Sequence, residues 1–322
     1  IFGKSHMVIR KQAQYFDIKV LKVTLNRHFD YFKYSITSRP AVERNEEGEY
    51  INDYFTDRVL DYIEDSKDER FFLLLSTHLP HTPVQGKPEI VKKYQEKDRG
   101  NSPHKSAAYA AMVETIDTNT GRILKKLEDL NLRKNTLIIF ASDNGGLLSP
   151  GATSNSPLNK GKGFLYEGGI RVPLIVAWDG VIEEGTVCDE IVHTIDFYPT
   201  MLDVGKASRP KHKLEGLSML PLWNDSKESL ARDAMFWHFP GYAMGSQGRI
   251  MPKARPQSTV RSGDFKLIEN LEDNSLELYN LKEDISERNN LAGSIPEKAQ
   301  ELLKQLKKWR KDTGAPMITK KG

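Results

Sequence analysis

Two short segments in the middle of the chain carry residue types that bind cations and anions. Residues 136–146 read Thr-Leu-Ile-Ile-Phe-Ala-Ser-Asp-Asn-Gly-Gly, an apolar strand that ends on the carboxylate of Asp143 and the amide of Asn144. In open α/β sheets ligands bind beyond the carboxyl ends of the strands, and hard divalent cations prefer such oxygen ligands. The pattern predicts a metal-binding turn at Asp143 and Asn144. A plain turn is the competing interpretation, because all four residue types favour turns.

The second segment places Lys162 between two glycines. Residues 159–171 read Asn-Lys-Gly-Lys-Gly-Phe-Leu-Tyr-Glu-Gly-Gly-Ile-Arg. Glycine allows the backbone to approach a ligand closely, and a lysine about 4 Å from an anion in a partly shielded site gains roughly 4 kcal/mol. A solvated basic loop is the alternative, since exposed charge pairs gain far less. We expect Lys162 to meet an anion in the same crevice as the metal turn.

Two histidines follow an apolar run at residues 71–75. His78 and His81 both occur in His-x-Pro steps. Proline pushes the residue before it toward an extended conformation, whereas two-histidine metal pairs usually have helical spacing. The functional interpretation is one histidine acting as a general acid or hydrogen-bond donor, because the pKa of histidine lies near working pH. Ordinary loop histidines are the alternative.

Apolar spacing predicts the elements that must position these residues. Helices are expected at 54–64, 104–131 and from 196 with Pro199 in the first turn, and buried strands at 71–75, 136–140 and 173–178. The order strand, helix, strand favours an α/β fold with a mostly parallel central sheet flanked by helices. Strands at 233–239, 258–269 and 276–281 with a helix at 296–311 predict a small C-terminal antiparallel sheet with one helix. The predicted domains are a core over 1–228 and an α+β subdomain over 229–322.

Composition excludes several classes of partner. The 322 residues carry a net charge of +3 with both signs interspersed, which argues against nucleic acid. No run approaches 18 apolar residues, so no membrane span is expected. Cys188 is the only cysteine, so no internal disulfide forms. The chain opens on Ile1 with neither an initiator Met nor a signal peptide, and we expect it to be a fragment.

Several segments, in order along the chain, resemble motifs of the formylglycine-dependent sulfatase family in the alkaline-phosphatase-like superfamily. They are Gly3-Lys4-Ser5-His6 (G-K-W-H in the family), Phe29-Asp30-Tyr31-Phe32 (G-F-D-Y-F), Pro80-His81-Thr82-Pro83 (P-H-x-P), Ser142-Asp143-Asn144-Gly145 (S-D-N-G) and residues 161–173 (G-K-G-x-x-Y-E-G-G-x-R-x-P). Residues 261–268, 278–281 and 289–291 resemble the C-terminal subdomain. Ser5 stands where the family has Trp, and His28 where it has Gly.

The resemblance implies a role for each matching residue. Asp143 and Asn144 would bind one divalent cation, usually Ca²⁺, and Lys4, His6, His81 and Lys162 would surround the sulfate and the catalytic aldehyde hydrate. His81 is preferred over His78 as the catalytic histidine because it matches P-H-x-P. His238 is expected to line the substrate pocket, with a packed core histidine as the alternative.

One part of the family pattern is absent from the sequence. The family nucleophile is a formylglycine made from the Cys or Ser of C/S-x-P-x-R. Neither this motif nor the Asp-Asp pair that completes the family's metal site occurs in this sequence. Cys188 and the stretch at 38–40 do not replace the motif. We therefore expect the formylglycine in a missing N-terminal segment, and the 322-residue chain to be inactive alone.

The resemblance implies a sulfuric ester hydrolase, arylsulfatase-like, that cleaves sulfate esters of sulfated carbohydrates. The alternatives are a related phosphodiesterase or phosphonate hydrolase, which usually employs two metals, and a non-catalytic truncated paralogue that binds sulfated glycans. By family habit, we expect export to the periplasm, the cell exterior or the lysosome.

Overall fold

The chain folds into two compact units. The computed structural model describes residues 2–3, 20–23, 31–32, 36–39, 48–148, 153–224, 228–242 and 255–318. One unit spans residues 1–136 with 151–153, and the other spans residues 137–150 with 154–322. The domain boundary expected near residue 228 differs from this division and stays a prediction.

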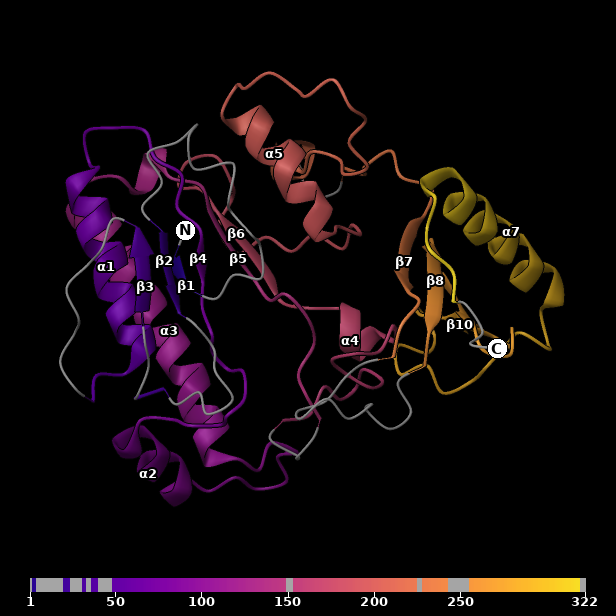
Figure 1. The fold of residues 1–322 in the computed structure, drawn as a ribbon, viewed down its shortest axis with the longest axis horizontal. Coiled ribbons are helices and arrows are strands. Elements are labelled where there is room, and N and C mark those ends of the chain that lie inside the picture. Colours follow the sequence, from indigo (N-terminus) through magenta and orange to yellow (C-terminus); the bar gives the residue numbers. More distant parts are fainter. Residues whose placement is uncertain are drawn as a thin grey trace. The chain divides into compact units, whose positions relative to one another are not determined.

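The first unit is built on a four-stranded sheet (Figure 1). Its strands are β1 (Phe2–Gly3), β2 (Val20–Val23), β3 (Ile36–Arg39) and β4 (Leu75–Ser76), in the order β3-β2-β1-β4. Strand β1 pairs in parallel with both β2 and β4, whereas β2 and β3 are antiparallel. Two of the three pairings are therefore parallel, as the predicted α/β class requires.

Helices of the first unit pack through apolar stripes. Helix α1 (Ile51–Asp65) buries Phe55, Val59 and Ile63, which recur at the spacing of one helix face. It packs against α3 (Ala107–Asp129), whose first turn is capped by the Ser106 hydroxyl, which accepts the Tyr109 N–H at 3.1 Å. Both predicted helices are confirmed. Helix α2 (Pro88–Glu96), which also packs on α3, and a 3₁₀ turn at Arg133–Asn135 were not predicted.

The apolar run at 71–75 is less buried than its composition predicts. Only its last residue belongs to a strand, and Phe72 and Leu74 are 63% and 44% exposed. Exposure alternates along the run, so one face packs and the other is open in the described structure. The expectation of a strand buried on both faces is wrong, because a continuous apolar run does not reveal how many layers cover it.

The second unit contains a two-stranded sheet that leads into the predicted metal turn. Strands β5 (Ile138–Ala141) and β6 (Leu174–Ala177) occur where strands were predicted, but they pair with each other antiparallel. Parallel neighbours need a crossover connection, usually a helix. Among the described residues of this connection, the only helix is the four-residue α4 (Glu167–Ile170). The parallel pairing inferred from the order of elements is wrong at this point.

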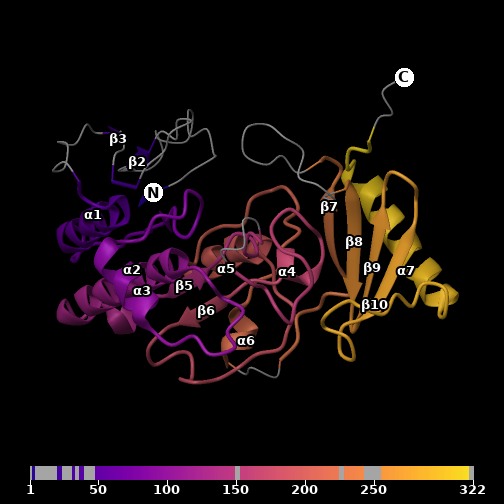
Figure 2. The ribbon, with the colours of Figure 1, turned by 90° about the horizontal axis from the view of Figure 1, so that it is seen from below.

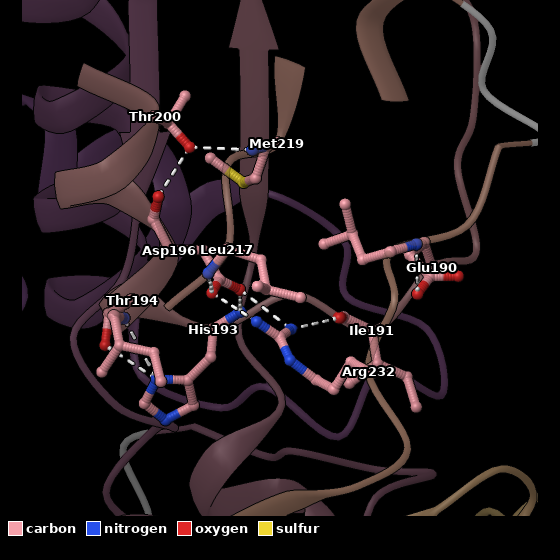
Figure 3. Close-up of polar contacts among 11 residues, drawn as sticks. Glu190, Ile191, His193, Thr194, Asp196, Thr200, Leu217, Met219 and Arg232 are labelled. Atoms are coloured by element: carbon pink, nitrogen blue, oxygen red, sulfur yellow. Dashed lines mark hydrogen bonds and ion pairs between the residues drawn. The ribbon is translucent and has the colours of Figure 1, made fainter. Parts of the chain in front are cut away.

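A buried ion pair fixes the segment that follows β6. Asp196 is the last residue of a 3₁₀ turn (Thr194–Asp196) that precedes α5 (Phe197–Val204). Its carboxylate is fully buried. It accepts the backbone N–H groups of His193 at 2.7 Å and Leu217 at 2.8 Å, and pairs with Arg232 (Figure 3). Arg232 also donates to the Ile191 carbonyl at 2.9 Å. One carboxylate thus joins three stretches of chain, and α6 (Leu220–Asn224) follows the second of them.

The C-terminal part is an antiparallel sheet covered by one helix (Figure 2). The strands are β7 (Met235–Phe239), β8 (Gln257–Ser262), β9 (Phe265–Asn270) and β10 (Leu276–Asn280), in the order β10-β9-β8-β7. Helix α7 (Pro296–Thr313) packs on the sheet through a buried cluster comprising Val260, Leu267, Leu278, Ala299, Leu302, Leu303 and Leu306. The predicted sheet and helix are confirmed, except that the single strand expected at 258–269 turns at Gly263, whose φ is +56°.

Candidate active site

The predicted metal turn lies directly after β5. The Asp143 side chain is exposed. The Asn144 amide nitrogen donates to the Gly145 carbonyl at 3.1 Å, and Oδ1 accepts no hydrogen bond from any residue that the structure describes. The Ser142 hydroxyl donates to the Asn144 carbonyl at 2.9 Å and braces the turn. Two hard oxygen donors therefore stand on adjacent residues at the carboxyl end of a strand.

Hydrogen bonds join this turn to the lysine-bearing loop. The Asn155 side chain accepts the Gly146 N–H at 3.1 Å through Oδ1 and donates to the Gly146 carbonyl at 2.9 Å through Nδ2. The same Nδ2 donates to the Lys160 carbonyl at 3.0 Å. The Lys162 N–H donates to the Gly146 carbonyl at 3.2 Å. Gly146 and Asn155 thus hold the two predicted segments against each other.

Glycine is required where the segments touch. The Gly145 N–H donates to the Gly169 carbonyl at 3.0 Å. A Cβ atom at Gly145 would lie 1.7 Å from the Gly168 carbonyl oxygen, and one at Gly161 would lie 2.3 Å from the Gly146 carbonyl oxygen. The contacted atoms are backbone and have no rotamer by which to withdraw. The glycines of both motifs are therefore explained by close backbone approach.

The Lys162 side chain is half-buried. Across the described parts of the chain, its ammonium has no ion-pair or hydrogen-bond partner. A partly shielded cation without a protein partner is suited to an anionic ligand. The structure thus brings Lys162 and the Asp143–Asn144 turn into one unit, linked through Gly146.

A buried charge cluster anchors the far end of the lysine loop. The fully buried Lys266 ammonium on β9 pairs with Glu167 Oε1 at 2.9 Å and with Glu287 Oε1 at 2.8 Å. The other oxygen of Glu287 accepts the Glu167 N–H at 2.7 Å, at the start of α4. Arg261 on β8 lies 3.7 Å from Glu167. Burial raises the pKa of the Glu287 carboxyl, and Lys266 opposes that rise. The C-terminal sheet therefore fixes the loop through charges.

His81 and His78 occupy different environments in the first unit. His81 is exposed, and its Nδ1 lies 2.7 Å from the Thr82 carbonyl. Its own carbonyl accepts the Tyr31 hydroxyl at 2.7 Å, which fixes the backbone at this position. His78 is buried, and its ring stacks on Phe55 at 6.3 Å between centroids. Exposure makes His81 the more accessible of the two, and its catalytic role stays a prediction.

The remaining residues predicted for the site are Lys4, His6 and His238. Lys4 and His6 lie outside the described residues. His238 on β7 directs Nε2 at the Pro316 carbonyl at 2.6 Å, and its Nδ1 lies 2.5 Å from the Ser258 hydroxyl. Because a carbonyl only accepts, Nε2 carries the proton. Both ring nitrogens are thus engaged within the C-terminal part, and substrate contact by His238 stays a prediction.

The oxygen atoms of Asp143 and Asn144 are of the chemical type that binds Ca²⁺. Ca²⁺ takes six to eight oxygen ligands, and Asp143 with Asn144 offers a carboxylate and an amide oxygen. Within the residues that the structure describes, no group of three or more His, Cys, Asp or Glu residues is placed to hold a metal. A cation held by Asp143 and Asn144 would therefore need further oxygen ligands, and the metal-binding role of this turn stays a prediction.

Several residues that build the site are not evident from the sequence. Asn155 joins the metal turn to the lysine loop, and the pairing of Glu167 and Glu287 with Lys266 anchors that loop. Asn155 carried only a turn signal. A lysine within a strand, such as Lys266, is normally expected to face solvent. Its two partners, Glu167 and Glu287, are 99 and 21 residues away in the sequence, so no local spacing indicates the cluster.

Within the described residues, no helix is both long and apolar enough to span a bilayer.

Comparison with known proteins identifies the family. Residues 1–207 match the sulfatase family, and residues 160–313 match the C-terminal part of N-sulphoglucosamine sulphohydrolase. A sulfatase of Formosa agariphila is 37% identical over 83% of this chain and 51% of its own length. An N-acetylglucosamine-6-O-sulfatase of Bacteroides thetaiotaomicron is 30% identical over 71% of this chain and 38% of its own length. The chain thus spans about half the length of the first of these relatives and less than half of the second.

Solved structures agree with the alkaline-phosphatase-like fold. The crystal structure of Ps i-CgsB has a TM-score of 0.72 at 27% identity and covers 85% of this chain and 57% of its own. A protein solved in complex with its substrate D-glucosamine-2-N,6-O-disulfate has a TM-score of 0.73 at 21% identity, over 96% of this chain and 78% of its own, which shows the fold alone. With the family match over residues 1–207, these findings establish that the chain belongs to the sulfatase family.

Proposed function

We propose that the protein is a sulfuric ester hydrolase that cleaves sulfate esters of carbohydrates. The observation that carries the proposal is the junction at Gly146, which holds the Lys162 loop against the Asp143–Asn144 turn. Membership of the sulfatase family supports it. One site then offers oxygen donors for a divalent cation beside an amine that no described protein group neutralises.

This arrangement suits a sulfate ester because charge grows on the leaving oxygen as the S–O bond breaks. Preorganised positive groups stabilise that charge most effectively in a partly dry site. Lys162 would bind a sulfate oxygen, and the hydrogen bonds through Asn155 would keep the lysine loop from moving as charge develops. A bound divalent cation would supply further charge stabilisation at the sulfate. His81 would act as proton donor to the leaving oxygen.

The carbohydrate substrate class is supported by the names of related proteins. A relative is named N-acetylglucosamine-6-O-sulfatase, and Ps i-CgsB, a structural neighbour at 27% identity, was also solved in complex with k-i-k-neocarrahexaose. A sulfated sugar is therefore the first substrate to test.

The test is sulfate release by the protein expressed from its complete gene. Incubated with Ca²⁺ and N-acetyl-D-glucosamine-6-O-sulfate, it should release inorganic sulfate, measured by ion chromatography. Lys162→Ala should lower kcat/KM by about 100-fold or more, the usual cost of removing a group that stabilises transition-state charge. Lys162→Arg keeps the charge and should retain more activity than the alanine variant.

A matched control separates this effect from a general loss of positive charge. Lys282→Gln removes an exposed lysine on the loop after β10 and should leave sulfate release unchanged. The proposal is wrong if the protein cleaves a phosphodiester or phosphonate ester and no sulfate ester, or if Lys162→Ala keeps full activity with sulfated sugars.

A further inference from the structure

A polar pocket of about 250 Å³ lies beside the lysine loop in the second unit. Residues 154–160 form one wall, and Leu148, Ser286 and Arg288 complete it. Lys160 belongs to this wall and precedes Lys162 by two residues. Since two residues span at most about 7 Å of chain, the pocket lies beside the backbone that carries Lys162.

The amide side chains of the pocket wall are already committed to holding it in shape. Asn155 is bonded to both backbone groups of Gly146 and to the Lys160 carbonyl. Asn159 donates through Nδ2 to the Glu287 carbonyl at 3.3 Å. Its own carbonyl accepts the Gly168 N–H at 2.8 Å. The bonds of Asn155 to Gly146 connect the wall to the metal turn. The bonds of Asn159 connect the wall to Glu287 and Gly168, at the end of the lysine loop that the buried charges hold.

The charged groups that remain are both positive. Lys160 and Arg288 line the pocket, and no Asp or Glu does. In the ranges that the structure describes, neither cation has an ion-pair partner. The Lys160 ammonium lies 5.9 Å from the centre of the Phe164 ring. The nearby carboxylate of Asp284 accepts the backbone N–H groups of Arg288 and Asn289, so it is occupied by the turn itself.

We propose that this pocket binds a second anionic substituent of the substrate, a sulfate or a carboxylate, while Lys162 binds the sulfate that is cleaved. This inference rests on the proposed function and defines its substrate class as multiply charged glycans. The guanidinium of Arg288 offers paired N–H donors to a planar or tetrahedral oxyanion. Lys160 adds a point charge, and the hydroxyls of Ser156 and Ser286 at the wall can donate to further oxygens.

The test compares binding of singly and doubly charged sugars to the full 322-residue chain by calorimetry in Ca²⁺-containing buffer. The probes are N-acetyl-D-glucosamine-6-O-sulfate, D-glucosamine-2-N,6-O-disulfate, and a 6-O-sulfated N-acetylglucosamine linked to a hexuronic acid. The second charge should tighten binding about fivefold, the upper end of the gain expected of an exposed charged contact. The double variant Lys160→Gln/Arg288→Gln should reduce that ratio to near one.

Lys282→Gln is the matched control, because it removes one positive charge from an exposed position outside the pocket. It should keep the wild-type ratio. A gain with the disulfate alone assigns the pocket to sulfate, and a gain with both doubly charged probes assigns it to oxyanions in general.

Two results are distinguishable failures. If the double variant keeps the full preference for the second charge, or if the wild type shows no such preference, the pocket proposal is overturned while sulfate cleavage stands. If the monosulfate and both doubly charged probes fail to bind, and the protein expressed from its complete gene releases no sulfate, the proposed function itself fails.

Discussion

Gly145 shows how one residue sets the geometry of the site. The carbonyl of Gly168 lies where a side chain at Gly145 would be, and the Gly145 N–H donates to Gly169. The turn and the lysine loop touch through backbone atoms, so their close approach depends on the absence of a methyl group at Gly145.

Replacing Gly145 by Ala should therefore lower the free energy of unfolding by about 1–3 kcal/mol or more, the range for inserting a methyl group without room to relax. Gly293→Ala is the matched control, since Gly293 is exposed and a Cβ there would meet nothing within 4 Å. It should change stability by no more than about 0.5 kcal/mol. Urea unfolding of both variants measures the difference, and equal stabilities would refute the packing explanation.

His193 provides a second test at this scale, through pH. Its Nδ1 accepts the Ile195 N–H at 3.2 Å, a bond that protonation removes. Burial lowers the pKa of this ring below its ordinary value of 6.5, Arg232 acts in the same direction, and Asp196 opposes them. The unfolded chain therefore takes up the proton more readily than the folded protein. The associated stability is present above pH 6.5 and is lost as the pH falls through and below that value.

The variant His193→Asn keeps an acceptor for the Ile195 N–H and does not titrate in this range. Its free energy of unfolding should fall less than that of the wild type between pH 7.5 and pH 5, measured by urea unfolding at a series of pH values. Above pH 7.5 the His193 ring is neutral in both the folded and the unfolded wild type. The free energies of unfolding of the two proteins should therefore change with pH most similarly in that range. Parallel curves throughout would show that His193 does not contribute to the pH dependence.

At the scale of elements, the C-terminal sheet has a part in the site although it supplies no predicted catalytic residue. Lys266 on β9 is fully buried between Glu167 at the start of α4 and Glu287 after β10. Since α4 ends the lysine loop, the sheet and the loop are joined by charges that water does not screen.

The change Lys266→Met should cost about 3–5 kcal/mol of unfolding free energy, because it leaves two buried carboxylates without their cation. The triple variant Lys266→Met/Glu167→Gln/Glu287→Gln removes all three charges and should recover most of the loss, since neutral groups of similar size carry no unpaired buried charge. Guanidinium unfolding compares the three proteins. A single variant as stable as the wild type would mean that the cluster is not structurally important.

Prediction succeeded for elements with local periodicity and failed for their pairing. The stripe of Phe55, Val59 and Ile63 follows from spacing along one helix, so α1 was predictable. The antiparallel pairing of β5 with β6 depends on how the connection between them folds. Likewise, the exposure of Phe72 and Leu74 depends on what lies across from them, which the run itself does not specify.

At the scale of the whole molecule, binding of an ion to the folded state is linked to global stability. Any ligand that binds only the folded protein stabilises it by mass action, by about 2.7 kcal/mol at a hundredfold excess over its Kd. Asp143 and Asn144 present oxygen ligands of the kind that Ca²⁺ prefers.

Adding Ca²⁺ at millimolar concentration should therefore raise the thermal unfolding midpoint, measured by calorimetry, whereas the same ionic strength of NaCl should not. Asp143→Asn should remove most of the shift because it removes the carboxylate charge. Asp189→Asn, at another exposed position, should retain it. A shift that persists in Asp143→Asn would place the ion elsewhere in the molecule.

The sequence by itself determined the motifs, the helices and the strands that carry them, because helix and strand periodicities and turn chemistry are properties of neighbouring residues. The strand and loop pattern predicted that Asp143, Asn144 and Lys162 share one crevice, and the resemblance to a family implied the role of each. The tertiary structure decided that Asn155 holds the two motifs together, that Lys266 is buried between two carboxylates, and that Lys160 and Arg288 share a pocket. These contacts join residues that are up to 128 positions apart, and their energies arise from burial and charge pairing that exist only after the chain has folded.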